Sequence, residues 1–281
     1  MSVHFALLGN PTGHSPAPRM WNGLFARAGV EWRYAAHDVR PGELGFWVDV
    51  LRCGTLSGAH VTMPLKAQAA DAADVRDADV ERAGVANWLA LEHDELTARN
   101  LDVAAARALI GERRFEQALV LGAGGAARGL LTALAGACDA VAIVSDDAEG
   151  AAALARQANG WFAAAAARPW QQLGALAARS DLIVNATPLG MAGRDEPSPL
   201  AAAELRPGAR LYDLVYRPDG SATPLQAAAL EAGAEVVDGL AHFEAQAVAS
   251  LPHVGLAPAL AGDVTPAVAR LAGRAGRRWR G

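Results

Sequence analysis

The sequence predicts an α/β fold in two domains, and three observations support this class. The chain has 281 residues, and globular domains average about 150 residues, so we expect two domains. Strand-like and helix-like segments alternate as β-α-β-α-β over the first third of the chain, which is typical of a layered unit with its own core. From Gln117 onward, short apolar runs alternate with alanine-rich helical segments, as in a doubly wound parallel sheet.

The expected elements of the first third are bounded by glycine, proline and asparagine. The predicted strands are residues 3–8, 31–39, 56–63, 86–91 and 95–98, the last two forming a hairpin that carries Asn87 and Asn100 at its ends. The predicted helices are residues 18–28, 41–51, one that opens at Pro64-Leu65-Lys66, an acidic helical segment at 71–82, and 102–110. Asp102 is expected at the N-cap or in the first turn of its helix.

The later strands are predicted at residues 118–121, 140–144, 161–165, 181–185, 210–215 and 235–237. Six such strands suffice for a complete nucleotide-binding sheet. A helix is expected at 241–251, and a last helix at 266–272 that returns to the first domain.

The stretch ALVLGAGGAARGL, residues 118–130, indicates a dinucleotide-binding turn. Gly122 lets the chain turn off a buried strand, Gly124 lets the backbone approach a pyrophosphate, and Gly125 and Ala126 keep the helix start thin, with Ala123 between them. The helix that follows would direct unpaired N–H groups and a partial positive charge at the phosphates. A merely tight strand-to-helix turn is the alternative interpretation.

Asp146 follows the second predicted strand of this region, close to the spacing of about 20 residues expected for an acid that binds a ribose 2′-hydroxyl. A carboxylate would repel a 2′-phosphate, and no arginine follows in the turn, so NAD is favoured over NADP. The alternative is that Asp146 and Asp147 only cap the next helix.

Composition excludes several classes of function. The chain is 52% hydrophobic and 20% charged, with a net charge of -5, so neither disorder nor a general attraction to nucleic acid or anionic membranes is expected. Cys53 and Cys138 stand far apart without metal-ligand spacing, so no disulfide framework and no metal site are predicted. No leader-like N-terminus and no apolar run of 18 residues is present, and a cytoplasmic protein is expected.

Several motifs in order give the chain a resemblance to the shikimate dehydrogenase family, including its quinate/shikimate branch. They are GNPTGHSPAP (9–18), GAHVTMPLK (58–66), AN (86–87), NLD (100–102), GAGGAARG (122–129), NATPLGM (185–191), YDLVYRP (212–218) and DGLAHFEAQA (238–247). The resemblance implies a substrate and catalytic domain from residues 1–102 and 240–281, a Rossmann-type dinucleotide-binding domain from 103–239, and a cleft between them.

The resemblance also implies the roles of individual residues. Lys66 and Asp102 would face the hydroxyl that is oxidised; the substrate-binding residues would be Ser15, Thr62, Asn87, Tyr216 and Gln246; and Thr187, Leu214 and Gly239 would lie along the nicotinamide. A lysine transfers a proton near neutral pH only if its surroundings lower its pKa from about 10.4, and otherwise it orients and stabilises charge. Without the motifs, Lys66 could equally be solvated and Asp102 only a helix cap.

The chain departs from the family pattern at positions assigned to the pocket. Ala17 stands where a second hydroxyl is usual, His60 replaces Asn, Trp88 and Leu101 replace Thr, and Ala241 and His242 replace Gly and Met. A pocket with different polar groups selects a different ligand, so these changes leave the hydroxylated ring open; drift with compensation is the alternative.

The function predicted from sequence is an NAD(P)-dependent oxidoreductase, with NAD favoured and NADP possible, that interconverts a ring alcohol and ketone on a hydroxylated ring carboxylic acid. We expect a monomer or homodimer. The alternatives are a catalytically weak dinucleotide-binding regulator of the same fold and, ranked last, a folate-type dehydrogenase.

Overall fold

The computed structural model describes residues 3–194, 196–217 and 219–271. The chain divides into two compact units, one formed by the residues up to Ala105 together with those from Glu244 onward, and the other by Ala106–Phe243. The two divisions fall inside helices α5 (Leu101–Ile110) and α10 (Gly239–Ser250), whereas the sequence-based boundaries were 102/103 and 239/240.

The first unit is built on a six-stranded sheet with the order β2-β1-β3-β5-β6-β4. Its strands are β1 (His4–Gly9), β2 (Arg33–Asp38), β3 (Gly58–Val61), β4 (Val75–Arg76), β5 (Trp88–Glu92) and β6 (Glu95–Arg99). The first three strands pair in parallel, and β5 and β6 form the predicted antiparallel hairpin. The β-α-β-α-β expectation for this part of the chain therefore matches the structure.

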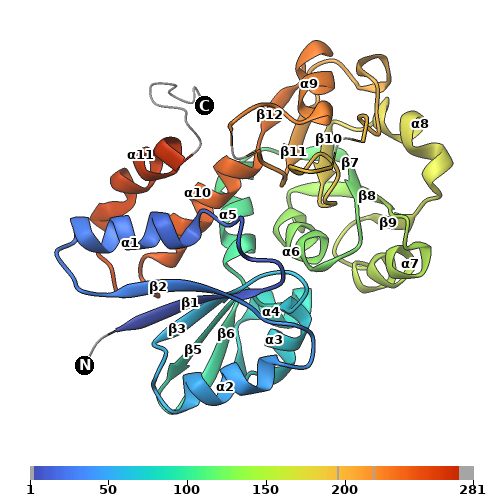
Figure 1. Cartoon of the computed structure of the whole chain (residues 1–281). Coiled ribbons are helices and arrows are strands. Elements are labelled where there is room, and N and C mark those ends of the chain that lie inside the picture. The colour runs from blue at the N-terminus through green and yellow to red at the C-terminus, as the bar shows by residue number, and fades with distance from the viewer. Residues whose placement is uncertain (1–2, 195, 218, 272–281) are drawn as a thin grey trace. The chain divides into compact units, whose positions relative to one another are not determined.

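Side-chain alternation gives this sheet two different faces. On one face, Leu8, Val61 and Leu89 join an aliphatic core with helices α2 (Leu44–Arg52) and α3 (Lys66–Ala72). On the other face, an aromatic group packs around helix α1 (Ala17–Arg27); it consists of Phe5, Trp21, Phe25, Tyr34, His60 and Trp88. Figure 1 shows α1 and α11 on one side of the strands and α2 on the other.

The acidic segment 71–82, expected to be helical, is broken by the short strand β4. Helix α3 ends at Ala72 and α4 covers Ala78–Ala83. Between them, Asp74 exchanges hydrogen bonds with the backbone of Leu96 and pairs with Arg52. These tertiary contacts outweigh the helical tendency of the sequence.

The second unit is a doubly wound parallel sheet, as predicted. Its strands are β7 (Phe115–Leu121), β8 (Cys138–Val144), β9 (Ala164–Ala167), β10 (Leu182–Asn185), β11 (Arg210–Asp213) and β12 (Glu235–Val237). The order β12-β11-β10-β7-β8-β9, with every pair parallel, is that of dinucleotide-binding domains. Strand β9 lies later than the expected 161–165 because its alanine run gives no β-branched signal that would fix the strand ends.

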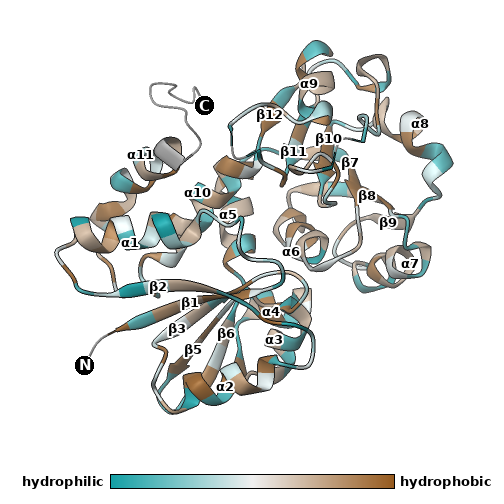
Figure 2. Ribbon diagram, in the orientation of Figure 1, coloured by the Kyte–Doolittle hydropathy of each residue, from teal (hydrophilic) through white to brown (hydrophobic). Residues whose placement is uncertain are grey.

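Helices cover both faces of the second sheet (Figure 1). They are α6 (Gly125–Leu134), α7 (Ala148–Gln157), α8 (Leu173–Ala177) and α9 (Pro224–Glu231), with short 3-10 turns at Trp170–Gln172 and Ala202–Glu204. Leu119, Ile183 and Leu211 form one core with α8 and α9. Figure 2 shows hydrophobic residues along the strands and more hydrophilic residues along the helices.

The last described segment is longer and more helical than expected. After a 3-10 turn at Pro258–Leu260, helix α11 runs Ala261–Leu271 with Pro266 in its interior. The sequence-based start at Pro266 was therefore wrong; Ala272, its expected end, lies outside the described residues. Helix α11 packs on α1 within the first unit. In the described part of the chain, every helix is too short or too polar to span a membrane.

Candidate active site

The centre of the candidate active site is a Lys66–Asp102–Gln246 cluster in the first unit. Lys66 is the first residue of α3, and its Nζ lies 2.5 Å from Oδ2 of Asp102 in the first turn of α5. Gln246 of α10 donates from Nε2 to the other carboxylate oxygen across 3.3 Å. The Lys66 and Asp102 side chains are only 16% and 8% exposed. Such a shielded pair can hold and exchange a proton with a bound hydroxyl.

Lys66 is the only lysine in the chain, although Lys and Arg together number 25. Arginine keeps its proton under all ordinary conditions, whereas a lysine amine can release one. An amine is therefore retained at the one position where it meets a buried carboxylate. Counting lysines would have identified this residue without any motif.

Asn87 lies against the first turn of α5, which carries Asp102, and it has an unused amide donor. Its Oδ1 accepts from the backbone N–H of Leu101 across 2.6 Å, which fixes the orientation of the amide. Its buried Nδ2 has no hydrogen-bond partner within the described residues. A buried donor without a partner is costly, and a ligand oxygen would satisfy it.

Ser15 and Thr62 lie in loops that leave the carboxyl ends of β1 and β3. Ser15 Oγ accepts weakly from the N–H of Ala17, and Thr62 donates its N–H to Leu8. Both side chains are partly exposed, and both loops follow parallel strands, where α/β sheets bind ligands. Their role in substrate binding stays a prediction.

The glycine-rich turn of the second unit joins β7 to α6. Gly122 has a φ of +99°, and a Cβ there would lie 3.0 Å from the carbonyl oxygen of Ala186. Gly124 is the N-cap of α6, with open space where a side chain would project. The bare helix start, flanked by Ala123, Gly125 and Ala126, therefore leaves room for a phosphate group against free N–H donors.

The neighbouring strand ends of β10 and β11 are held together by a buried carboxylate that sequence reasoning missed. Asp213 accepts from Asn185 Nδ2 (2.8 Å), Val215 N, Thr223 Oγ1 and Gln226 Nε2. Burial raises the pKa of Asp213 to about 6, against the lowering effect of these hydrogen bonds.

This carboxylate orders the residues predicted along the nicotinamide. Asn185 Oδ1 accepts from both the N–H and the hydroxyl of Thr187. Gly239 lies so close to the Leu214 carbonyl that a Cβ would be 2.2 Å from its oxygen. Thr187, Leu214 and Gly239 thus lie at the carboxyl edge of the sheet, on the β10 side of Gly122.

Asp146 and Asp147 have different roles in the structure. Asp147 caps α7, with its carboxylate accepting from Gly150 N across 2.9 Å. Asp146 does not cap the helix; it is exposed at the end of β8 and accepts from Ser145 Oγ and Asp147 N. The capping alternative therefore holds for Asp147 alone.

Tyr216 and His242 belong to the second unit. Tyr216 packs against Phe243, and burial raises the pKa of its hydroxyl to about 12. His242, in the first turn of α10, has its Nδ1 2.8 Å from the buried Tyr212 hydroxyl, and Ala241 donates its N–H to Asp238. The proposed contact of Tyr216 with substrate stays a prediction.

Four departures from the family pattern lie in the interior of the first unit. His60, Trp88 and Leu101 are at most 4% exposed, and Ala17 is 5% exposed. Trp88 fills the space left by Gly58, where a Cβ would be 2.5 Å from the indole ring. His60 is hydrogen-bonded through both ring nitrogens. The bulk of these residues is thus accommodated by packing among protein side chains, which the sequence alone did not show.

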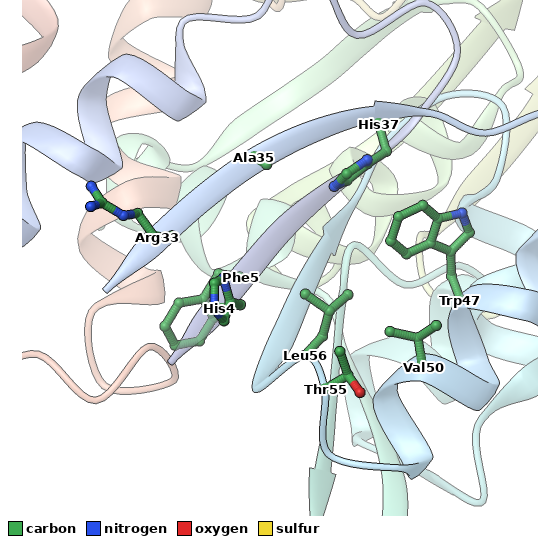
Figure 3. A pocket seen from close by; sticks show the side chains of 9 residues that line it. All are labelled: His4, Phe5, Arg33, Ala35, His37, Trp47, Val50, Thr55 and Leu56. Atoms are coloured by element: carbon green, nitrogen blue, oxygen red, sulfur yellow. The ribbon is translucent and has the colours of Figure 1, made fainter. Parts of the chain in front are cut away.

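A small pocket lies away from these residues, between β1, β2 and α2. Its volume is about 240 Å³, and its wall includes His37 and Trp47, whose ring centroids are 4.4 Å apart (Figure 3). None of the candidate site residues lines it.

The fold defines the class as a two-unit α/β protein with a dinucleotide-binding sheet. Residues 7–89 match the family model of the shikimate dehydrogenase substrate binding domain. The "Shikimate dehydrogenase (NADP(+))" of Moorella thermoacetica is 37% identical over 84% of this chain and 82% of its own. The chain therefore belongs to the shikimate dehydrogenase family of oxidoreductases.

Solved structures agree with this assignment. A shikimate dehydrogenase in complex with NADP+ superposes with a TM-score of 0.84 at 28% identity, covering 96% of this chain and 95% of its own. The enzyme from Thermus thermophilus, in complex with NADP(H) and shikimate, gives a TM-score of 0.80 at 30% identity, covering 96% and 99%.

Proposed function

We propose that this protein catalyses the NAD(P)-linked interconversion of a ring alcohol and a ketone on a shikimate- or quinate-like hydroxy acid. The observation that carries the proposal is the Lys66–Asp102–Gln246 cluster beside the unused amide donor of Asn87. It is supported by the relatives, whose names specify shikimate dehydrogenase.

The Lys66–Asp102 pair manages the proton of the reacting hydroxyl. Oxidation of a carbinol removes two electrons with the C–H hydrogen and releases the O–H proton, and this pair receives that proton. In reduction, the pair returns a proton to the forming alkoxide. Gln246 and Asn87 hold neighbouring hydroxyls, because their amides can both donate and accept.

The second unit fits a nicotinamide dinucleotide. The positive φ of Gly122, the open space at Gly124 and the uncapped start of α6 form the cradle that a pyrophosphate requires. When bound, the nicotinamide supplies the hydride acceptor or donor. Thr187, Leu214 and Gly239 are the residues of this chain that would hold its ring, at an edge ordered by Asp213.

We propose that NAD is preferred over NADP. Asp146 is exposed at the end of β8 and leaves helix capping to Asp147, so its carboxylate is available to accept from a ribose hydroxyl. The same charge would repel a 2′-phosphate. The names of the relatives specify NADP(+), so this chain would differ from them in cofactor.

The test is turnover of a panel of cyclic hydroxy acids, including shikimate and quinate, by the wild type and by Lys66→Arg with both cofactors. Arginine keeps the positive charge and the Asp102 partner but cannot exchange a proton. We expect wild-type turnover and a loss of kcat of about a hundredfold or more in the variant. Turnover that is unchanged in Lys66→Arg would reject proton transfer by this residue.

Because the chain has a single lysine, the protonation of the Lys66 amine can also be measured directly. Reductive methylation with a carbon-13 label marks Lys66 and the N-terminal amine alone, and NMR then follows the Lys66 amine as pH and ligand are varied. Absence of turnover on every acid of the panel, with tight binding of NADH, would instead support a dinucleotide-binding regulator.

A further inference from the structure

A continuous chain of buried hydrogen bonds joins three elements on the aromatic face of the first sheet. Tyr34 of β2 places its hydroxyl 3.0 Å from Nδ1 of His60 on β3. His60 Nε2 lies 2.9 Å from Oγ of Ser250 at the end of α10, and Ser250 Oγ donates to the backbone carbonyl of Gln246 across 2.7 Å.

The hydrogen atoms of this hydrogen-bond network can be arranged in only one way. Ser250 gives its single hydroxyl proton to Gln246, so it must accept from His60, whose Nε2 therefore carries the hydrogen. Nδ1 is then the acceptor for the Tyr34 hydroxyl. Burial lowers the pKa of His60 to about 3 and raises that of Tyr34, so both groups stay neutral. Hydrogen bonds aligned in one direction strengthen one another.

These hydrogen bonds connect the two segments that meet at Asp102, namely β3 with the residues up to Lys66 and the Gln246–Ser250 turn of α10. His60 lies on the strand that leads directly to Lys66, and Ser250 lies one helical turn after Gln246. Lys66 and Gln246 bind the two different oxygens of the Asp102 carboxylate. A shift of the Gln246–Ser250 turn away from β3 would therefore move Gln246 relative to the Lys66–Asp102 pair.

We propose that His60 is a positioning residue for the reaction: its ring fixes the Gln246–Ser250 turn of α10 to β3 and thereby places Gln246 against Asp102. The inference rests on the proposed function, because it presumes that Gln246 holds a substrate hydroxyl. Both ring nitrogens are already engaged, so His60 does not itself exchange a proton with the substrate. This role differs from simple core packing because the placement of Gln246 depends on a single hydrogen bond, the one from His60 Nε2 to Ser250.

Two serines provide a matched pair for the test. Ser250→Ala removes the link between His60 and α10. Ser180→Ala removes an equally buried hydroxyl that also donates to the carbonyl four residues earlier, that of Leu176, at 2.8 Å, but Ser180 belongs to the second unit, whereas His60 belongs to the first. We expect Ser250→Ala to raise KM for the hydroxy acid about tenfold with a smaller change in kcat, and Ser180→Ala to leave KM within about twofold.

Two substitutions of His60 distinguish the roles of its two ring nitrogens. In His60→Gln the side-chain amide nitrogen reaches the position of Nε2 and can still donate to Ser250. In His60→Asn the amide ends at the position of Nδ1 and cannot reach it. We expect His60→Gln to keep KM near wild type and His60→Asn to match Ser250→Ala, with no further effect in the double variant. Equal KM values for the two His60 variants, or additive effects with Ser250→Ala, would overturn the proposal.

A spectroscopic measurement keeps this test separate from the proposed function. NMR of protein labelled with nitrogen-15 should show His60 as the neutral Nε2–H tautomer, and Ser250→Ala should shift the Gln246 side-chain amide signal while Ser180→Ala leaves it in place. An Nδ1–H tautomer, or a Gln246 signal unmoved in Ser250→Ala, overturns the positioning role even if no acid is turned over. If both signals behave as expected and no acid is turned over, the proposed function fails while the positioning of Gln246 stands.

Discussion

The amide of Asn185 donates to the carboxylate of Asp213 across 2.8 Å, joining the ends of two adjacent parallel strands. The amide oxygen of Asn185 orders Thr187, and the other oxygen of Asp213 binds Thr223 and Gln226 of α9. One buried carboxylate thus orients two loops that the sheet alone would leave independent.

Asp213→Asn should destabilise the protein by about 3 kcal/mol, because the amide nitrogen would face a donor instead of accepting from it. Urea unfolding monitored by tryptophan fluorescence measures this change. Asp219→Asn is the control, since among the described residues the exposed Asp219 carboxylate forms side-chain hydrogen bonds with Ser221 alone. Equal unfolding midpoints for both variants and the wild type would show that the Asp213 network contributes no stability.

Gly122→Ala should weaken dinucleotide binding by about tenfold or more and lower stability by about 1–3 kcal/mol. The φ of +99° is unfavourable for alanine, and the added Cβ would press on the Ala186 carbonyl. Fluorescence titration with NADH measures the binding. Gly124→Ala is the comparison, because its Cβ would enter open space in the unliganded protein; it should fold normally and lose affinity only. Full NADH affinity in both variants would contradict the assigned cradle.

Asp146→Asn should reduce the preference for NADH over NADPH by about tenfold, since it removes the charge that repels a 2′-phosphate. Dissociation constants for both cofactors measure the ratio. Asp147→Ser removes a neighbouring charge while keeping a capping oxygen for α7, and it should change the ratio much less. Tighter binding of NADPH than NADH by the wild type would reject the proposed preference.

His60 should make the protein less stable as the pH falls. Its pKa is about 3 in the folded chain against 6.5 for a free imidazole, so between these values the unfolded state binds a proton that the folded state excludes. Stability therefore rises with pH across this window, by up to about 1.4 kcal/mol per unit. Asp213 acts in the opposite direction, because its pKa is raised from 3.8 to about 6.

Comparison with His60→Gln isolates the histidine, because Asp213 is common to both proteins. Urea unfolding measures the free energy of unfolding at about pH 6.5 minus that at about pH 4.5. We expect this signed difference to be about 2 kcal/mol more positive for the wild type than for the variant, in which only the opposing contribution of Asp213 is left. Identical differences would mean that the His60 ring becomes protonated in the folded state.

The sequence predicted the two α/β units, the hairpin and the six parallel strands because glycine, proline and apolar periodicity act locally. It failed where pairing with distant residues decides the structure: β4 forms because Asp74 meets Leu96 and Arg52. The same limit applies to the site. Motifs pointed to Lys66, Asp102 and Gln246, but the partners of His60 come from β2 and α10, and no local pattern indicates them.

The course of the chain through the two units determines the order in which the His60 network can form during synthesis. Residues 106–243 form a complete unit of their own, inserted between the two parts of the other. Tyr34, His60 and Lys66 leave the ribosome before that unit is made, whereas Gln246 and Ser250 follow it. Since domains fold largely as they emerge, the nascent first sheet lacks both the Ser250 partner of His60 and the Gln246 donor to Asp102 while that unit is being made. The histidine acquires its serine partner only when the nucleotide-binding unit has been translated in full.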